Sequence, residues 1–264
     1  MLKLGCAYPR KEDKRRIKLS AILKEMYLPS EFDAEVDIYK KPFPGRMWLN
    51  DDYSDCVIAA QANHTRVLEY IEQGYLINIT DKDVETLYKA ESNGEDNGLY
   101  TLDAMNWWHS KGWDVAGGSA AVKTRGCWHK KPKPTNSQHL DIYAYAEMDS
   151  IEELYRAIYY LHGAYIAVRL TNNDIKQFKN GEIWSLKDGD TDYIGGHALD
   201  VPRFLPDGNL ECWTWAKRQL MTPDWYKARV YDTVGVVDGR DNFLSNSPVD
   251  CEKLNALLLE IVNS

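Results

Sequence analysis

Residues 50–75 read NDDYSDCVIAAQANHTRVLEYIEQGY, and the interpretation of the whole chain starts from this stretch. A polar, acidic loop ends at Asp55, and apolar residues then recur at helical spacing behind Cys56. Ser54 or Asp55 can cap the first turn of this helix, and Gly74 can end it. The sequence therefore predicts an amphipathic helix with a cysteine in its first turn.

A cysteine at this position has two interpretations. The positive end of the helix dipole lowers the pKa of a thiol and favours the reactive thiolate. A small buried cysteine with a purely structural role suits the start of a helix equally well. The rest of the sequence is needed to decide whether Cys56 is a nucleophile or a packing residue.

Composition and charge restrict the class of protein. The 264 residues carry a net charge of −8, which argues against nucleic acid as the main partner. No apolar run approaches the ~20 residues of a membrane span, and the first residues lack a signal-peptide pattern. Five scattered cysteines without zinc-ligand spacing predict reduced thiols and no metal site. We therefore expect a cytoplasmic protein that requires no cofactor and binds neither nucleic acid nor membrane.

The first 45 residues are predicted to form an N-terminal extension or arm. Lys and Arg concentrate at residues 10–18, and Pro42 and Pro44 lead into the loop before Cys56. This basic arm can dock on an acidic surface of a protein partner, in an oligomer or assembly, or fold back on the acidic remainder of the chain. A solvated arm without a partner is the third alternative.

The remaining sequence divides into a helical part and a strand-rich part. Helical patterns cover residues 56–74, 81–92, 101–112, 150–163 and 248–262. Alternating or short apolar runs predict strands at residues 139–146, 164–170, 193–204, 209–216 and 229–237. Helices come first and strands follow, so we predict an α+β fold with a helical lobe at 46–125 and a β-rich lobe at 126–264, both within one domain.

A nucleophilic cysteine requires a base, and His197 is the best candidate among the six histidines. It follows Gly195 and Gly196, which allow another backbone to approach closely, and it lies in a predicted strand. His64, by contrast, shares the apolar face of the first helix and is predicted to be a core or interface residue.

The order of four segments resembles the papain-like cysteine peptidase superfamily. They are the loop and helix around Cys56, NGLY at 97–100, the helix–Gly–strand unit at 150–170, and GGHALDV at 195–201 with WTW at 213–215. The interval from Cys56 to His197 also falls within the roughly 130–150 residues that separate the two residues in papain-type proteases. The resemblance implies a two-lobed fold with a cleft between a helical lobe and an antiparallel β-rich lobe. The run NDDYSDCVIAA also resembles uncharacterised papain-like proteins of bacteria and their phages.

This resemblance implies roles for individual residues. Cys56 would be the nucleophile and His197 the general base and acid. Asn50 stands where the family has the amide that binds the oxyanion together with the backbone N–H of the cysteine, although its side chain is one methylene shorter. The substrate-binding residues implied by the resemblance are Gly98, Gly196 and Trp215.

One position departs from the family pattern. An ungapped count from His197 places Trp213 where the family has the Asn that orients the imidazole. An indole only donates, so it cannot accept a hydrogen bond from the imidazole N–H. Thr214 or Glu211 can take this role if the register shifts by one or two residues. Loss of such orientation costs about 10⁴ in rate in a related triad.

The acidic run at Asp188, Asp190 and Asp192 lacks the Gly and Glu of a calcium-binding loop. It is either a solvated loop or the source of a mild preference for basic substrates.

Two functions from different classes follow. The first is a thiol hydrolase, a cysteine peptidase or amidase that acts on a peptide or protein through an acyl-enzyme on Cys56. The alternative is a catalytically degraded papain fold with a structural or binding role, such as a phage virion or assembly component, which would place the chain in a virion. A transferase or deamidating enzyme with the same Cys–His pair is a third, weaker option.

Overall fold

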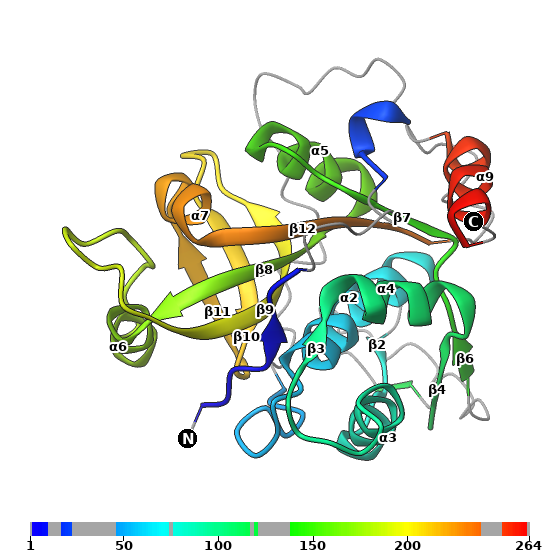
Figure 1. The fold of residues 1–264 in the computed structure, drawn as a ribbon, viewed down its shortest axis with the longest axis horizontal. Helices are drawn as coiled ribbons and strands as arrows, with labels where there is room; N and C mark the ends of the chain where they lie inside the picture. Colours follow the sequence, from blue (N-terminus) through cyan, green and yellow to red (C-terminus); the bar gives the residue numbers. More distant parts are fainter. Residues whose placement is uncertain are drawn as a thin grey trace, which may run out of the picture.

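The computed structural model describes residues 2–9, 17–22, 46–73, 76–116, 119–120, 138–238 and 250–262. An antiparallel sheet forms one half of the molecule, and the helices α2, α3 and α4 lie on the other side of the N-terminal strand (Figure 1). The bounds of these helices are Cys56–Gln73, Asp81–Glu91 and Thr101–Ser110. The predicted α+β class is confirmed, whereas the domain boundaries remain predictions.

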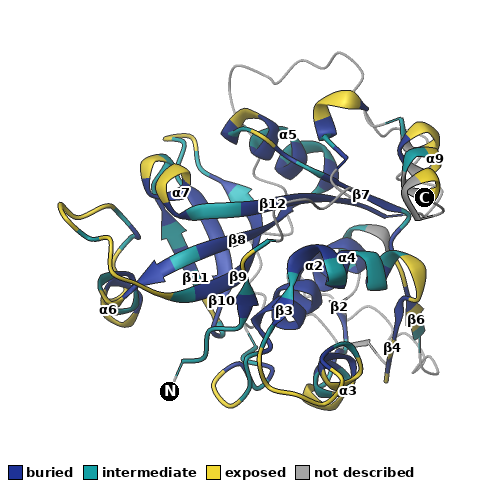
Figure 2. Cartoon of the chain, in the orientation of Figure 1, coloured by how far each residue is buried: buried dark blue, intermediate teal, exposed yellow. Residues whose placement is uncertain are grey.

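The sheet has the strand order β11-β10-β9-β8-β12-β7, and every neighbouring pair is antiparallel. Its strands are β7 (Ala144–Glu147), β8 (Ala164–Thr171), β9 (Tyr193–Phe204), β10 (Leu210–Thr214), β11 (Lys217–Met221) and β12 (Val230–Val237). Helix α5 (Ile151–Leu161) and helix α2 both pack against it. Strand β8 is therefore buried along almost its whole length, as its continuous apolar run AYIAVRL requires (Figure 2).

Side-chain caps set the starts of several helices. Thr80 caps α3, because its side chain accepts from the Asp83 N–H while the Asp83 carboxylate accepts from the Thr80 N–H. Ser150 caps α5. The remaining described helices are the single 3₁₀ turn at Leu19–Ala21, α6 (Asn172–Asn180), α7 (Pro223–Arg229) and α9 (Cys251–Val262).

Two predicted strands differ from the structure. The pattern at residues 139–146 is divided between β6 (Gln138–Leu140), which pairs with β4 (Trp113–Val115), and β7, which joins the large sheet. The pattern at 209–216 ends early, because Trp215 and Ala216 form a turn with φ of 44° and 62° that leads into β11. Helices α6 and α7 and strand β11 were not predicted. A short pair, β2 (Leu76–Ile77) with β5 (Ser119–Ala120), completes the described strands of the helical half.

The N-terminal segment lies inside the fold. Strand β1 (Cys6–Ala7) pairs in parallel with β3 (Leu99–Tyr100), and the Leu99 N–H donates to the Gly5 carbonyl at 2.9 Å. Further along the predicted arm, Lys18 reaches Glu147 at 3.0 Å and Asp149 at 2.6 Å. Lys18 therefore contacts the acidic part of the chain, as the second of the three alternatives expects at this residue, whereas residues 10–16 lie outside the described residues.

Helix α2 is attached to the sheet by two buried hydrogen bonds. The Tyr165 hydroxyl on β8 donates to the Val57 carbonyl in the first turn of α2 at 2.8 Å. Two turns further along, His64 Nδ1 lies 2.9 Å from Asp200 Oδ1 on β9, and both side chains are fully buried. Tyr165 and Asp200 are direct partners across β8 and β9. The paired residues Tyr165 and Asp200 therefore hold α2 at two points along its length. His64, one of these points, is a core residue.

No helix in the part of the chain that the structure describes combines the length and the apolar character needed to cross a membrane.

We expect Asp200→Ala to reduce the free energy of unfolding by about 3 kcal/mol, because it removes one partner of a buried pair and leaves the other polar group without compensation. Urea denaturation measures this change. Asp188→Ala is the matched control, since Asp188 is exposed and its loss is expected to change stability by less than about 0.5 kcal/mol. Equal small effects of both substitutions would contradict the assigned role of the His64–Asp200 pair.

Candidate active site

His197 lies on β9, and its imidazole is held by a hydrogen bond and by a stacked aromatic ring. Its Nε2 is 2.6 Å from the Thr214 hydroxyl, and the Trp215 ring stacks on the imidazole with centroids 4.1 Å apart at 15°. The side chain is only 1% exposed. Nδ1 forms no hydrogen bond within the described part of the chain. The imidazole is therefore held at one nitrogen and has the other one unused.

A bulge explains why Thr214, and not Trp213, faces the imidazole. The β9–β10 pairing joins Glu211 to Arg203 but Trp213 to Asp200, so β9 contains one extra residue beside Pro202. Proline has no N–H for the ladder and is tolerated in a sheet at such irregularities. Because Trp213 pairs with Asp200, the next residue along β10, Thr214, has its side chain on the same face of the sheet as His197.

Trp215 is positioned by a strained turn. Trp215 and Ala216 are the two central residues between β10 and β11, and both have positive φ. Hairpins with two such residues normally use Asn or Gly there, because a Cβ disfavours the left-handed region. The strained backbone turns the indole over His197, and strain of this kind is often found beside functional groups.

Cys56 begins α2 and is 1% exposed. Burial raises the pKa of its thiol well above the ordinary value, although the backbone N–H groups of Ala198 and Gly5 favour the thiolate. The thiol therefore lies beside the residue that follows His197 on β9. No hydrogen bond joins the sulfur to the imidazole, because Nδ1 has no partner.

Burial acts in the same way on His197, the predicted base. It lowers the pKa of His197 to about 3, so the imidazole is neutral at neutral pH. A neutral imidazole beside a protonated thiol is the expected state of the pair in this structure. It is not the ion pair of an activated cysteine.

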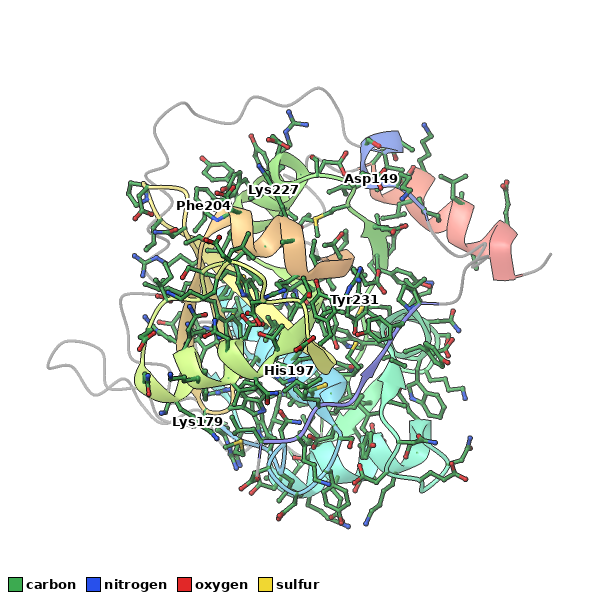
Figure 3. The ribbon with its side chains drawn as sticks, turned by 60° about the vertical axis from the view of Figure 1, so that its left-hand side comes forward. Asp149, Lys179, His197, Phe204, Lys227 and Tyr231 are labelled. Atoms are coloured by element: carbon green, nitrogen blue, oxygen red, sulfur yellow. The ribbon has the colours of Figure 1, made fainter. Side chains whose placement is uncertain are left out.

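The N-terminal segment passes between the two predicted substrate-binding glycines. A Cβ on Gly98 would lie 2.0 Å from the Gly5 carbonyl oxygen, and a Cβ on Gly196 would lie 2.1 Å from the Cys6 carbonyl oxygen. The Tyr231 hydroxyl on β12 donates to that same Cys6 carbonyl at 3.0 Å. His197 and Tyr231 both lie beside the path of this segment (Figure 3). The chain's own backbone thus fills the space beside both of the predicted substrate-binding glycines.

Gly5 is also in close contact with the loop before Cys56. A Cβ there would lie 1.9 Å from the Ser54 carbonyl oxygen in the loop before Cys56. The glycine is required at this position because the two backbones touch.

Asn50 is already engaged in hydrogen bonds in this structure. Its amide nitrogen donates to Asp55 Oδ1 at 3.0 Å and to the Tyr53 carbonyl at 3.4 Å, so it would have to rotate to reach an oxyanion. Burial raises the pKa of Asp55 to about 8, while the Asn50 hydrogen bond opposes this rise. The role of Asn50 at an oxyanion remains a prediction.

The other residues considered for orienting His197 have different partners. Glu211 forms ion pairs with Arg218 at 3.5 Å and Arg203 at 4.0 Å. Trp213 lies under the Arg218 guanidinium at 4.9 Å. Of the three residues, Thr214 alone has a hydrogen bond to the imidazole.

One residue of the acidic run, Asp190, is part of a largely buried network, whereas Asp188 and Asp192 are exposed. Asp190 accepts from Arg229 at 2.8 Å and from the Thr171 hydroxyl at 2.8 Å, and Arg229 is 2% exposed. Asp190 therefore neutralises a buried arginine. Across the described residues, no group of three or more His, Cys, Asp or Glu side chains is arranged to hold a metal ion.

Sequence reasoning missed Gly5, Cys6 and Tyr231, which surround the cysteine and histidine. The run LKLGCAY alternates apolar residues with others, which is a strand signal, but it is short and lies beside a strongly basic stretch. Tyr231 lies in a predicted strand, and no motif distinguishes it from a core residue.

No protein-family model matches the chain, and no curated protein matches it significantly. Solved structures do. Xylellain, a cysteine protease from Xylella fastidiosa, is similar with a TM-score of 0.59 and 16% identity over 90% of this chain and 97% of that chain. A procathepsin B from Trypanosoma congolense matches with a TM-score of 0.55 and 14% identity over 84% of this chain and 80% of its own.

A third similar structure is a cysteine protease of Carica candamarcensis in complex with E-64. It matches with a TM-score of 0.52 and 12% identity over 77% of this chain and 97% of that one. Identities this low show the fold alone. The chain has the α+β fold of the papain-like cysteine proteases, with Cys56 at the start of the central helix and His197 on the adjoining strand.

Proposed function

We propose that this chain is a papain-like thiol hydrolase that cleaves peptide or related amide bonds through an acyl-enzyme on Cys56, and that residues 2–8 hold it in a latent state. The observation that supports this most directly is the His197 environment, in which Nε2 bonds to Thr214 while Nδ1 is unused. The similar structures are cysteine proteases, which agrees with a peptide or protein substrate.

The Thr214 hydroxyl can accept from the imidazole Nε2–H, and that arrangement would give the tautomer that a general base needs. When the imidazole Nε2–H donates to this hydroxyl, the lone pair is on Nδ1, which is the nitrogen without a partner. Nδ1 would take the proton of Cys56 during attack and later deliver it to the leaving amine. Trp215 covers the ring and keeps water from the Nε2 hydrogen bond.

The start of α2 supplies donors for the oxyanion. The first amides of a helix have no partners within it, so the Cys56 N–H is available to a tetrahedral intermediate beside the sulfur. Asn50 would add a second donor after releasing Asp55 or Tyr53.

Latency follows from the position of the N-terminal segment. It covers Gly98 and Gly196, its Gly5 N–H lies beside Cys56, and the pKa shifts of Cys56 and His197 both come from burial. Departure of the segment would expose both glycines and return both groups to solvent.

A non-catalytic binding role is the second candidate. Two observations favour it: the complete filling of the site by the chain itself, and the absence of a hydrogen bond between Cys56 and His197. A phage virion or assembly component would be one form of such a role. Peptide turnover by a variant with an opened site separates the two functions.

Gly5→Ala is expected to open the site. The added Cβ would lie 1.9 Å from a backbone oxygen, and overpacking of this kind costs about 1–3 kcal/mol. The rate of Cys56 alkylation by iodoacetamide should therefore rise about tenfold or more. The fully buried Cys212 is the internal control and should stay unreactive.

The same variant tests the chemistry. Gly5→Ala should hydrolyse members of a peptide library, and Gly5→Ala with Cys56→Ala should not. An exposed Cys56 without any turnover would support the binding role and contradict the hydrolase.

The pH dependence of alkylation should shift with opening. In the native chain, burial raises the thiol pKa, so the Cys56 rate should rise only above the ordinary thiol range, with no step at acid pH from His197. Solvent returns in Gly5→Ala, which lowers the thiol pKa and raises the imidazole pKa. The profile should move to lower pH by about one unit or more. Identical profiles in the two chains would show that burial by the segment does not control Cys56.

Thr214→Val should disable the base. Valine has nearly the same shape but cannot accept from Nε2–H, so in the Gly5→Ala background kcat should fall by about 100-fold, within the ~10⁴ limit for lost orientation. Thr233→Val is the matched control, because Thr233 is a buried threonine that bonds to the Met148 carbonyl away from His197. Both variants should lose about 1–3 kcal/mol of stability, and only Thr214→Val should lose kcat. Equal kcat losses would contradict the role of Thr214.

A further inference from the structure

Arg169 lies at the edge of the candidate site. It is the direct partner of Gly196 across β8 and β9, one residue from His197. Its guanidinium is 6.0 Å from the ring centre of Tyr8 and 5.4 Å from that of Tyr193. Tyr8 comes two residues after Cys6, where the N-terminal segment leaves the site. Arg169 therefore faces a position that a bound substrate would occupy after the segment departs.

Two arginines share the Tyr193 ring and differ in their partners. Arg229, 5.3 Å from this ring, is buried and forms ion pairs with Asp174 at 3.3 Å and Asp190 at 2.8 Å. Arg169 has no ion pair within the described part of the chain, and its buried Nε has no hydrogen-bond partner. A guanidinium nitrogen that loses water without gaining an acceptor is unfavourable. A ligand oxygen would supply what is missing.

Tyr8, whose ring faces Arg169, is exposed enough to be replaced by other side chains. Tyr8 is 48% exposed and rests on Tyr231 with ring centroids 4.7 Å apart. Its ring offers Arg169 a π-face but no anion. A guanidinium held by aromatic rings presents its N–H groups in a plane, which is the geometry that binds a carboxylate through two parallel hydrogen bonds.

We propose that Arg169 is the specificity-determining residue of the substrate site and that it selects peptides with an Asp or Glu side chain at the position now taken by Tyr8. This inference rests on the proposed function only in that the opened site receives the substrate. It differs from the preference for basic residues that the acidic run suggested, and of that run Asp190 is already paired with Arg229.

The N-terminal segment provides a tethered ligand with which to test this. Four full-length chains are compared, carrying Tyr8→Glu or Tyr8→Gln with either Arg169 or Arg169→Gln. The rates at which iodoacetamide alkylates Cys6 and Cys56 report how often the segment leaves, and buried Cys212 reports global unfolding. Glu and Gln have the same shape, so only the charge differs.

With Arg169 present, we expect the Tyr8→Glu chain to be alkylated about fivefold more slowly than the Tyr8→Gln chain at low salt, as for a good partly exposed ion pair. In the Arg169→Gln background the two rates should be equal. Equal rates in both backgrounds, or a difference that persists without Arg169, would overturn the proposal.

A second measurement extends the test to substrate. In the Gly5→Ala background, peptides with Glu should have a higher kcat/KM than matched peptides with Gln, and Arg169→Gln should remove the difference. The alkylation comparison needs no turnover. An inactive Cys56 would therefore contradict the hydrolase proposal without affecting the result at Arg169. Turnover without a preference for Glu would contradict only the proposal for Arg169.

Discussion

The attachment of α2 to the sheet is the constraint on which the candidate site depends. The cysteine and the histidine come from different halves of the fold, and no hydrogen bond joins them. Their relative position is fixed instead by Tyr165 on Val57 and by His64 on Asp200. Polar contacts in a dry interior have strict geometry, since a shifted partner leaves a buried group unsatisfied. The apolar packing of α2 gives stability, and these two hydrogen bonds specify where along β8 and β9 the helix lies.

The sequence was sufficient to predict the parts of the fold that carry strong local signals. The helix behind Cys56, the Ser150-capped helix α5 and the long strand around His197 follow from apolar periodicity, caps and a glycine pair. The order of Cys56, Gly98 and His197 added the fold class, because it constrains segments that are distant in the chain. These signals are either local patterns or the order of residues along the chain, and a single sequence contains both.

The rest could not be predicted because it depends on contacts between distant segments. The extra residue beside Pro202 puts Thr214, and not Trp213, on the face of the sheet that carries the imidazole, and a bulge has no reliable sequence signal. The turn at Trp215 and Ala216 lacks the Asn or Gly that marks such hairpins, so β10 and β11 could not be separated. Strand β1 pairs with β3, which lies far along the chain from it. The short apolar run at β1 gives no indication of that partner.

The proposed latency would couple access and chemistry at this site. Burial favours the neutral forms of Cys56 and His197, so a chain closed by residues 2–8 would be both inaccessible to substrate and poor in thiolate. Opening would change both properties together, because the segment whose backbone covers Gly98 and Gly196 also places Gly5 beside the thiol. A closed state of this kind would need no separate inhibitory charge. Departure of the segment would relieve the desolvation, and the amides of Ala198 and of the first turn of α2 would then remain to favour the thiolate.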